Sequence, residues 1–143
     1  MQHKFLLHTQ WDGGRNAVGQ LQADRLTSNI SIPPEMEGPG IGTNPDEMLL
    51  GAAATCYIIS LAAMLERTNI EASLKMESEG IVDVTNGVFT YEQIIHSITI
   101  TLKNSSEKNR IMAERLAIKA ETTCMISKAL KGNVAIHMHV TIL

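Results

Sequence analysis

The residues best suited to chemistry are Cys56 and Cys124, the only two cysteines of the chain. They are far apart in sequence, and each lies in a stretch that predicts a helix. If the fold brings two such thiols together, one can attack an oxidant as a thiolate and the other can close a disulfide with it. Two buried, inert cysteines are the alternative, and they are the ordinary state of an intracellular domain. The sequence around the cysteines favours the first interpretation.

Three short motifs resemble those of a known family. They are Gly13-Gly14-Arg15, Thr43-Asn44-Pro45 followed by an apolar run to Cys56, and Cys124-Met125-Ile126-Ser127 followed by Lys131-Gly132-Asn133. In order and spacing, over nearly the whole chain, they resemble the OsmC/Ohr proteins. These are osmotically inducible protein C and the organic hydroperoxide resistance proteins, which are thiol-dependent peroxidases.

This resemblance implies that Cys56 is the peroxide-reactive thiol and Cys124 the resolving thiol. It also places Arg15 beside Cys56, where a planar guanidinium can hold a thiolate and a peroxide oxygen together. The alternative for Arg15 is a solvated arginine in a turn. Because Cys56 comes about three turns into its helix, the helix dipole helps it little, and Arg15 is expected to be its main activator.

The chain departs from the family at two of these positions. A family glutamate that orients the arginine lies ten residues before the first cysteine, where this chain has Asp46 with Glu47 beside it. Either carboxylate is therefore a candidate to hold Arg15, and both are alternatively simple charges at the positive end of a helix. Met125 stands where the family often has proline, so we expect a less rigid turn after Cys124.

The resemblance implies a fold and a set of partners as well. The fold is of the α+β class, with antiparallel sheets packed around long central helices in an intertwined homodimer. The expected substrate is a hydroperoxide, and the expected reductant is a dithiol of the lipoyl type. The alternative function is a protein of the same fold without enzymatic activity, which binds a small hydrophobic ligand or senses redox state.

Composition limits the other classes of function. The 143 residues are enough for a single domain, residues 1–143, and the net charge of −3 gives no basic face for nucleic acid. The start of the chain turns polar within a few residues, unlike a signal peptide, so we expect a cytoplasmic protein without a membrane segment. His137 and His139 share one face of a predicted strand, but no other ligand is close in sequence, and neither a metal nor a cofactor is expected.

The hydrophobic pattern predicts the elements that position these residues. Short strands are expected at residues 3–11, 16–23 and 25–32, followed by a loop at 33–42 that proline and glycine keep irregular. Thr43 or Asn44 then caps a helix that runs to about Arg67. This helix is apolar on nearly every face, so it should be buried, and the low aromatic content of 3% favours additional burial against a second subunit.

The second half of the chain predicts a long hairpin followed by two helices and a strand. The hairpin strands are residues 71–84 and 90–103, joined at Thr85-Asn86-Gly87, and the second strand alternates through Ile94, His96, Ile98, Ile100 and Leu102. A helix capped at Ser105 or Ser106 runs to about Thr123 with Ile111, Leu116 and Ile118 on its apolar side. A short helix over 125–130 and a final strand over 133–143 complete the prediction.

Overall fold

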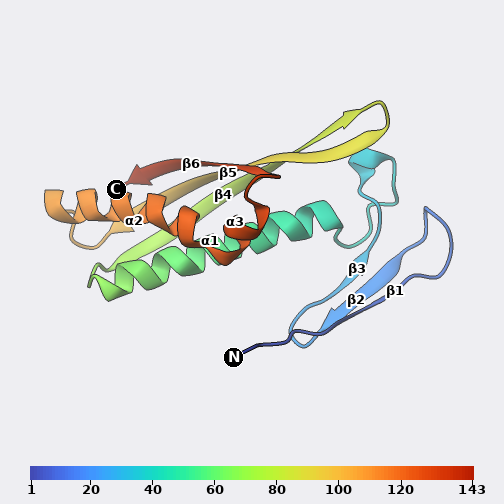
Figure 1. Ribbon diagram of the computed structural model, residues 1–143, viewed down its shortest axis with the longest axis horizontal. Coiled ribbons are helices and arrows are strands. Elements are labelled where there is room, and N and C mark those ends of the chain that lie inside the picture. The colour runs from blue at the N-terminus through green and yellow to red at the C-terminus, as the bar shows by residue number, and fades with distance from the viewer. The chain divides into compact units, whose positions relative to one another are not determined.

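In the computed structural model, which describes residues 1–143, three short strands precede a long helix, and a second sheet with two more helices follows (Figure 1). The contacts within the chain form two units, Met1–Met48 and Leu49–Leu143, and each is described by itself. The expectation of one domain over residues 1–143 stays a prediction.

The N-terminal unit contains a three-stranded antiparallel sheet. Its strands are β1 (Leu7–Gln10), β2 (Gly19–Ala23) and β3 (Thr27–Ile30), in the order β1-β2-β3. All three predicted strands are present, but each is shorter than the pattern suggested. The sequence predicts an irregular loop over residues 33–42. The structure differs in part, because this segment contains one turn of 3-10 helix, η1 (Pro34–Met36). Proline sets a φ that suits the first position of a helix, and the helix ends after one turn at Glu37, which has a positive φ of 60°.

Helix α1 (Pro45–Arg67) begins where the sequence predicts. The Asn44 side chain accepts a hydrogen bond from the Glu47 N–H at 2.9 Å, and Pro45 occupies the first helical position, where no N–H is needed. Within the chain only one stripe of the helix is buried, namely Ala53, Tyr57, Leu61 and Leu65. The prediction of a helix buried on all sides is therefore wrong for a single chain.

The outer surface of α1 remains strongly apolar. Its most apolar window has a mean hydropathy of 2.0, and 22% of that window is buried. By length and composition this is the one helix that could cross a membrane, but the core helix of a soluble protein meets the same criterion. The helix therefore has a large apolar surface that a single chain leaves uncovered.

The second unit is built on a sheet of three strands, in the order β4-β5-β6. The first two, β4 (Ala72–Thr85) and β5 (Val88–Leu102), form the predicted long hairpin. Its turn consists of Asn86 and Gly87, both with positive φ (53° and 74°), as a tight hairpin turn with the right twist requires. The third strand, β6 (Ala135–Ile142), pairs with β5 in parallel. The expectation of purely antiparallel sheets is thus wrong for this sheet, because a helical crossover carries the chain back before β6.

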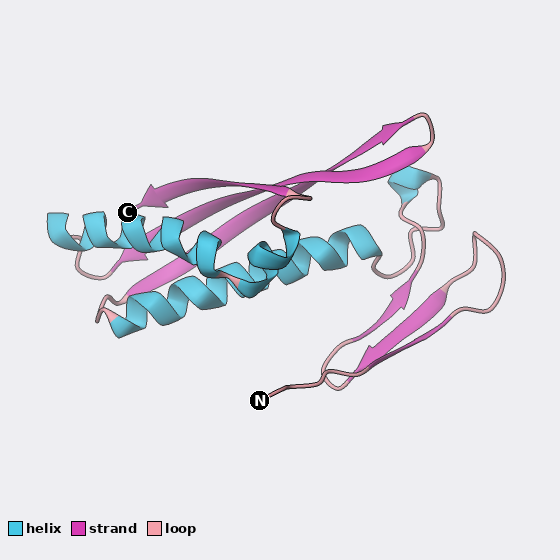
Figure 2. Cartoon of the chain, viewed as in Figure 1, coloured by secondary structure: helices cyan, strands magenta, loops and turns pink.

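That crossover consists of α2 (Glu107–Thr123) and α3 (Met125–Leu130). Ser106 caps α2 by accepting a hydrogen bond from the Asn109 N–H at 3.2 Å. Both α1 and α2 lie on the same face of the β4-β5-β6 sheet (Figure 2). The opposite face of the sheet carries polar side chains, including those of His137 and His139, which are exposed.

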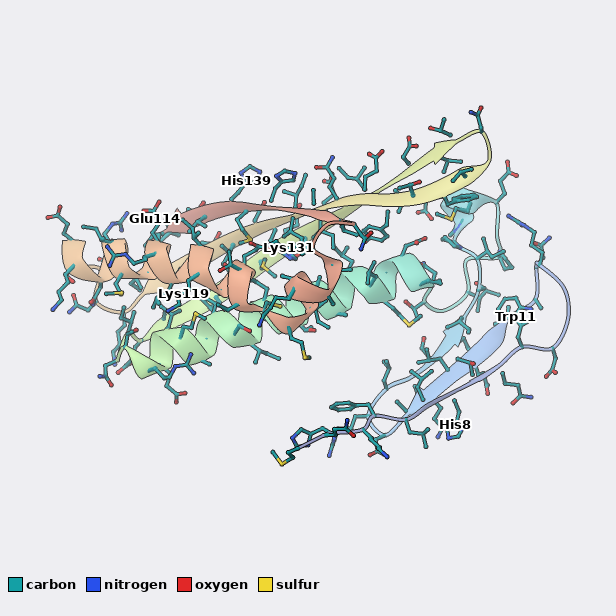
Figure 3. The ribbon with its side chains drawn as sticks, viewed as in Figure 1. His8, Trp11, Glu114, Lys119, Lys131 and His139 are labelled. Carbon is teal, nitrogen blue, oxygen red and sulfur yellow. The ribbon has the colours of Figure 1, made fainter.

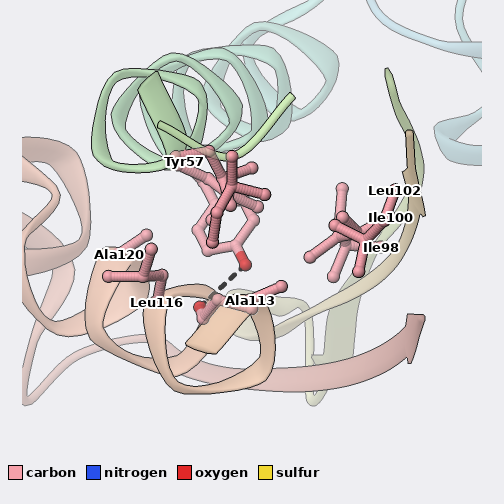
Figure 4. Packing of buried hydrophobic residues seen from close by; sticks show 11 residues of the cluster. Tyr57, Ile98, Ile100, Leu102, Ala113, Leu116 and Ala120 are labelled. Atoms are coloured by element: carbon pink, nitrogen blue, oxygen red, sulfur yellow. Dashed lines mark hydrogen bonds between the residues drawn. The ribbon is translucent and has the colours of Figure 1, made fainter. Parts of the chain in front are cut away.

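The core lies between this sheet face and the two helices (Figure 4). Tyr57 is its largest fully buried side chain, and its hydroxyl donates to the Ala117 carbonyl of α2 at 2.8 Å. The predicted alternation of β5 is confirmed, since its five inward residues are all buried. The members of the core cluster are Tyr57, Leu61, Leu65, Ile70, Ile98, Ile100, Leu102, Ala113, Leu116, Ala117 and Ala120.

The predicted apolar side of α2 is only partly right. Leu116 is buried, but Ile111 and Ile118 are more than half exposed (53% and 56%). Each helical residue turns by about 100°, so Ile118 points roughly opposite to Leu116, and Ile111 shares its side with Ile118. The buried face is made by small residues, of which Ala113 and Ala117 allow Tyr57 to approach the helix backbone.

Candidate functional site

The two cysteines meet in the C-terminal unit, although they are far apart in sequence. Cys56 lies on α1 and Cys124 at the junction between α2 and α3. Both are free thiols, and the Cys124 thiol donates a hydrogen bond to the Cys56 sulfur. Cys124 is buried, while Cys56 is partly exposed. One thiol is therefore accessible and the other is held behind it.

Cys124 is positioned by a break between two helices. Its backbone is extended (φ −59°, ψ 129°), so it ends α2 and begins α3 at the same time. Its N–H donates to the Ala120 carbonyl and its carbonyl accepts from the Lys128 N–H, both at 3.0 Å. The chain thus makes this turn with Met125 in place of the family's proline.

Four groups donate hydrogen bonds to the Cys56 sulfur. They are the Cys124 thiol, the backbone N–H groups of Ile126 and Met125 at the start of α3, and the Ser60 hydroxyl. Burial raises the pKa of the Cys56 thiol, but together these donors outweigh it and hold the pKa below its ordinary value. Hydrogen bonds of this kind stabilise the charged form of an acid. Cys56 is therefore the thiol that ionises more readily.

The environment of Cys124 has the opposite effect. Burial raises the pKa of the Cys124 thiol, and so does its hydrogen bond to Cys56, because ionisation would remove the donated proton. The backbone and hydroxyl of Ser127 and the backbone of Ile126 lower it, but by less. The two environments therefore favour ionisation of Cys56 over ionisation of Cys124.

The sequence analysis paired Cys124 with Cys56 but missed the other three donors to the Cys56 sulfur. Ser60 lies four residues after Cys56, a spacing that puts both side chains on one side of a helix, so its signal was present. The N–H groups of Met125 and Ile126 gave no signal, because backbone groups carry no sequence pattern. The dipole of α1 is of little use to Cys56, but the first turn of α3 supplies donors in its place.

Arg15 lies in the N-terminal unit, where its guanidinium binds backbone carbonyls. It donates to the carbonyls of Met36 at 2.7 Å and Glu37 at 3.2 Å, and to the Asn16 side chain at 2.9 Å. These bonds tie Arg15 to the end of η1. The role of Arg15 beside Cys56 stays a prediction.

The two acidic candidates lie in the first turn of α1. The Glu47 carboxylate accepts a hydrogen bond from the Thr43 hydroxyl at 2.8 Å, so it helps to begin the helix. This matches the alternative in which the carboxylate serves the helix end. Whether Asp46 or Glu47 holds Arg15 stays a prediction.

The described residues do not gather three metal-ligating side chains at one place. His137 and His139 lie exposed on β6, on the polar face of the sheet.

Comparison with known proteins identifies the family. The family model described as OsmC-like protein matches residues 38–139, which is more than half of the chain and includes both cysteines. The chain belongs to the OsmC-like protein family. The predicted resemblance to the OsmC/Ohr proteins is thereby confirmed.

Individual relatives of this OsmC-like protein extend the match over nearly its whole length. The uncharacterized protein YmaD of Bacillus subtilis is 54% identical over 142 residues, which cover 98% of this chain and 95% of YmaD. The organic hydroperoxide resistance protein OhrB of the same species is 28% identical over 131 residues, covering 88% of this chain and 90% of OhrB.

Solved structures share the fold. The OsmC-like protein from Mycoplasma pneumoniae superposes with a TM-score of 0.76 at 20% identity, over 100% of this chain and 99% of that one. The structure of OhrB from Bacillus subtilis gives a TM-score of 0.68 at 25% identity, over 96% and 98%. The α+β fold of the OsmC/Ohr type is thus confirmed.

Proposed function

We propose that this OsmC-like protein reduces organic hydroperoxides with Cys56 as nucleophile and Cys124 as resolving thiol. The observation that carries the proposal is the pairing of the two thiols, in which the pKa of Cys56 is lowered and the pKa of Cys124 is raised. The name of OhrB, a relative over most of the chain, supports hydroperoxide resistance as the biological setting.

The reaction consumes one hydroperoxide and two thiols. The Cys56 thiolate attacks the terminal peroxide oxygen, the O–O bond breaks, and the organic part leaves as an alcohol after it takes up a proton. The sulfenic acid on Cys56 is then attacked by the Cys124 sulfur, water leaves, and a disulfide forms. The peroxide gains two electrons, and an external dithiol returns them to the disulfide.

Arg15 is proposed to assist the first step. Its guanidinium would donate to the thiolate and to the departing oxygen, with Asp46 or Glu47 fixing its orientation. Arg15→Ala should slow the reaction with peroxide by about tenfold or more, which is about 1.4 kcal/mol in the barrier. Arg15→Lys should rescue it only in part, because a point charge cannot bridge several groups at once. An unchanged rate in Arg15→Ala would remove Arg15 from the mechanism.

The proposal includes the partners that the family suggests. They are a second copy of the chain in a homodimer and a dithiol reductant of the lipoyl type, and the protein would act in the cytoplasm. The large apolar surface of α1 outside the core supports the second copy.

The experiment that tests the function is a thiol titration with an organic hydroperoxide. One equivalent should remove both thiols of the wild-type protein, and peptide mapping should find the Cys56–Cys124 disulfide. Cys56→Ser should consume no peroxide, whereas Cys124→Ser should react once and accumulate oxidised Cys56. Normal turnover by Cys56→Ser would reject the proposal.

The same titration separates the enzyme from a ligand-binding protein of the same fold. A ligand-binding protein would keep both thiols after one equivalent of hydroperoxide. Its thiols would then be lost only slowly and without a defined disulfide.

A further inference from the structure

Helix α3 has one fully buried residue, and that residue is polar. Ser127 is 5% exposed, whereas the apolar residues Ile126 and Leu130 of the same helix are only half-buried. Figure 3 shows the end of this helix at Lys131. A helix on a protein surface normally turns its apolar side chains toward the core. What the hydroxyl of Ser127 contacts is therefore the question that its burial raises.

The Ser127 hydroxyl is a buried group without an oxygen or nitrogen partner. Such groups cost free energy and are uncommon in native cores. The polar atom that this hydroxyl contacts is the Cys124 sulfur. A protonated thiol is a weak acceptor, so the contact uses little of the hydroxyl's capacity to donate. A thiolate accepts a stronger, charge-assisted hydrogen bond, so the hydroxyl gains a full partner only when Cys124 is charged.

The position of Ser127 follows from the way in which α3 begins. Cys124 is the residue immediately before the helix, and Ser127 is the third residue within it. Side chains of a helix lean toward its N-terminus, so the third residue can reach back to the residue before the helix, as in a capping box. The Ser127 N–H has no partner within the helix, and it also acts on the Cys124 sulfur. Both donors of Ser127 thus converge on one sulfur.

We propose that the Ser127 hydroxyl is a catalytic group of the resolving step, in which it stabilises the negative charge that develops on the Cys124 sulfur. This inference rests on the proposed function, in which Cys124 closes the disulfide. In that step Cys124 loses its proton, its sulfur bonds to the sulfur of the Cys56 sulfenic acid, and the S–O bond breaks. The oxygen departs with the bonding electrons, takes up the proton from Cys124 and leaves as water. Ser127 keeps its own proton throughout.

Cys124 needs this stabilisation because the rest of its environment opposes ionisation. Burial and the hydrogen bond to Cys56 raise the pKa of Cys124, whereas the groups of Ser127 and Ile126 lower it. A donor that is in place before the reaction stabilises developing charge without a cost of reorganisation. Ser127 would serve Cys124 as Ser60 serves Cys56. The two chemical steps would therefore depend on two different hydroxyl groups.

The first test separates the two steps in a single turnover with one equivalent of tert-butyl hydroperoxide. Peroxide consumption measures the attack by Cys56, trapping with dimedone measures the sulfenic acid, and peptide mapping of quenched samples measures the disulfide. Ser127→Ala should consume peroxide within about twofold of the wild-type rate but form the disulfide about fivefold more slowly or worse, because a hydrogen bond to a charged group is lost. Dimedone-labelled Cys56 should accumulate in this variant.

Three further variants control this test. Ser127→Thr keeps the hydroxyl, and because Ser127 lines a cavity of about 620 Å³, the added methyl group has room. This variant should form the disulfide within about twofold of the wild-type rate. Ser60→Ala should instead slow the first step, and Ser73→Ala, at an exposed position of β4, should match the wild type. Disulfide formation at the wild-type rate in Ser127→Ala would overturn the inference, as would equal slowing in Ser127→Ala and Ser127→Thr.

The second test uses no peroxide, so its result does not depend on peroxidase activity. In Cys56→Ser, Cys124 is the only thiol, and ultraviolet absorbance follows its thiolate against Cys56→Ser/Cys124→Ser as the blank. Adding Ser127→Ala should raise the pKa of Cys124, and adding Ser127→Thr should not. Glu121 and Lys128, the charged residues nearest to Cys124 in sequence, are unchanged in each comparison. An unchanged pKa would overturn the inference, whereas a wild-type Cys56 that does not react with hydroperoxide would reject the proposed function instead.

The pH dependence of the resolving step distinguishes a catalytic hydroxyl from a structural one. Because the thiolate is the attacking species, disulfide formation should become faster as the pH rises through the pKa of Cys124. In Ser127→Ala this rise should move to higher pH, so that the variant approaches the wild-type rate in alkaline solution. A structural defect would instead slow the step equally at every pH, and that result would overturn the inference.

Discussion

Ser60 is the side chain near Cys56, other than Cys124, that contributes a donor to its sulfur. It lies one helical turn after Cys56, so no distant segment is needed to bring the two together. This contact is local to α1 and is expected to persist whatever the neighbouring chain does.

Ser60→Ala should therefore raise the pKa of Cys56. A hydrogen bond to a charged group contributes about 1 kcal/mol or more, which corresponds to about fivefold less thiolate near neutral pH. The pH dependence of alkylation of Cys56, followed by mass spectrometry, measures this effect. Ser73→Ala, at an exposed position of β4, is the control. An unchanged pH profile in Ser60→Ala would leave the backbone donors of α3 and the Cys124 thiol as the activators.

His96 is a fully buried titratable residue that packs against Tyr57, the residue after Cys56. Its Nδ1 lies 2.6 Å from the Ser78 hydroxyl, its ring stacks on Tyr57 with centroids 5.5 Å apart, and its Nε2 has no partner. Burial lowers the pKa of His96, because the charged imidazolium has no compensating carboxylate among these contacts. The folded protein therefore disfavours the charged form of this ring.

This burial predicts loss of stability in mild acid. The unfolded chain binds a proton at His96 near pH 6.5, whereas the folded chain does so only at lower pH. Stability from this group is thus fully present above pH 6.5 and falls below it, by at most about 1.4 kcal/mol per pH unit. Urea unfolding between pH 5 and 8 should show this slope in the wild type and a smaller slope in His96→Gln. Equal slopes would contradict the prediction, and an NMR titration of the His96 ring tests it without a variant.

At the scale of elements, the start of α3 connects backbone geometry to thiol chemistry. Cys124 has the extended backbone that a residue before proline prefers (φ −59°, ψ 129°), and Met125 begins a helix, where proline is tolerated. The Met125 side chain is 71% exposed, so little packing depends on it. The backbone would accept the family's proline without rearrangement.

Met125→Pro should therefore keep the fold but weaken the activation of Cys56. Proline has no N–H, so one of the four donors to the Cys56 sulfur is lost and the pKa of Cys56 should rise. Stability should stay within about 1 kcal/mol of the wild type or increase, because proline restricts the unfolded chain. Met125→Ala, which keeps the N–H, is the control for alkylation rates. If Met125→Pro and Met125→Ala react alike, the Met125 N–H does not activate Cys56.

At the scale of the whole molecule, much apolar surface is left uncovered in a single chain. Ile59 on α1 is 67% exposed, and it lies on the side of the helix opposite the buried stripe. All four residues of β1 are exposed, and Leu21 is the only buried large apolar residue of the N-terminal unit. A three-stranded sheet needs a packed face for stability. These surfaces favour a second subunit as their cover.

Ile59→Glu should therefore weaken the dimer. Burial of an unpaired carboxylate in an apolar interface costs several kcal/mol, so the variant should dissociate at concentrations where the wild type stays dimeric. Light scattering at micromolar concentration measures both masses, with Lys75→Glu on the polar sheet face as the control. A wild-type protein that is monomeric at this concentration would refute the dimer.

The sequence by itself determined where most helices and strands begin and end, and which two segments carry the cysteine motifs. The bounds of α1, α3 and the β4–β5 hairpin follow from local signals: Asn44 and Pro45 at a helix start, the Asn86-Gly87 turn, and the period of two through β5. Such signals act within a few residues, so they are readable without knowledge of the fold. The motifs around Cys56 and Cys124 were sufficient to predict the family that the comparisons then confirmed.

Only the tertiary structure decided what each element faces. The parallel pairing of β6, the exposure of Ile111 and Ile118, and the partial burial of α1 all depend on contacts between segments distant in the chain. The same is true of the α3 N–H groups that point at Cys56, since every residue other than proline carries an identical N–H. Hydrophobic pattern encodes which residues prefer burial, but the partner that buries them is chosen by packing over long sequence separations, which no local pattern contains.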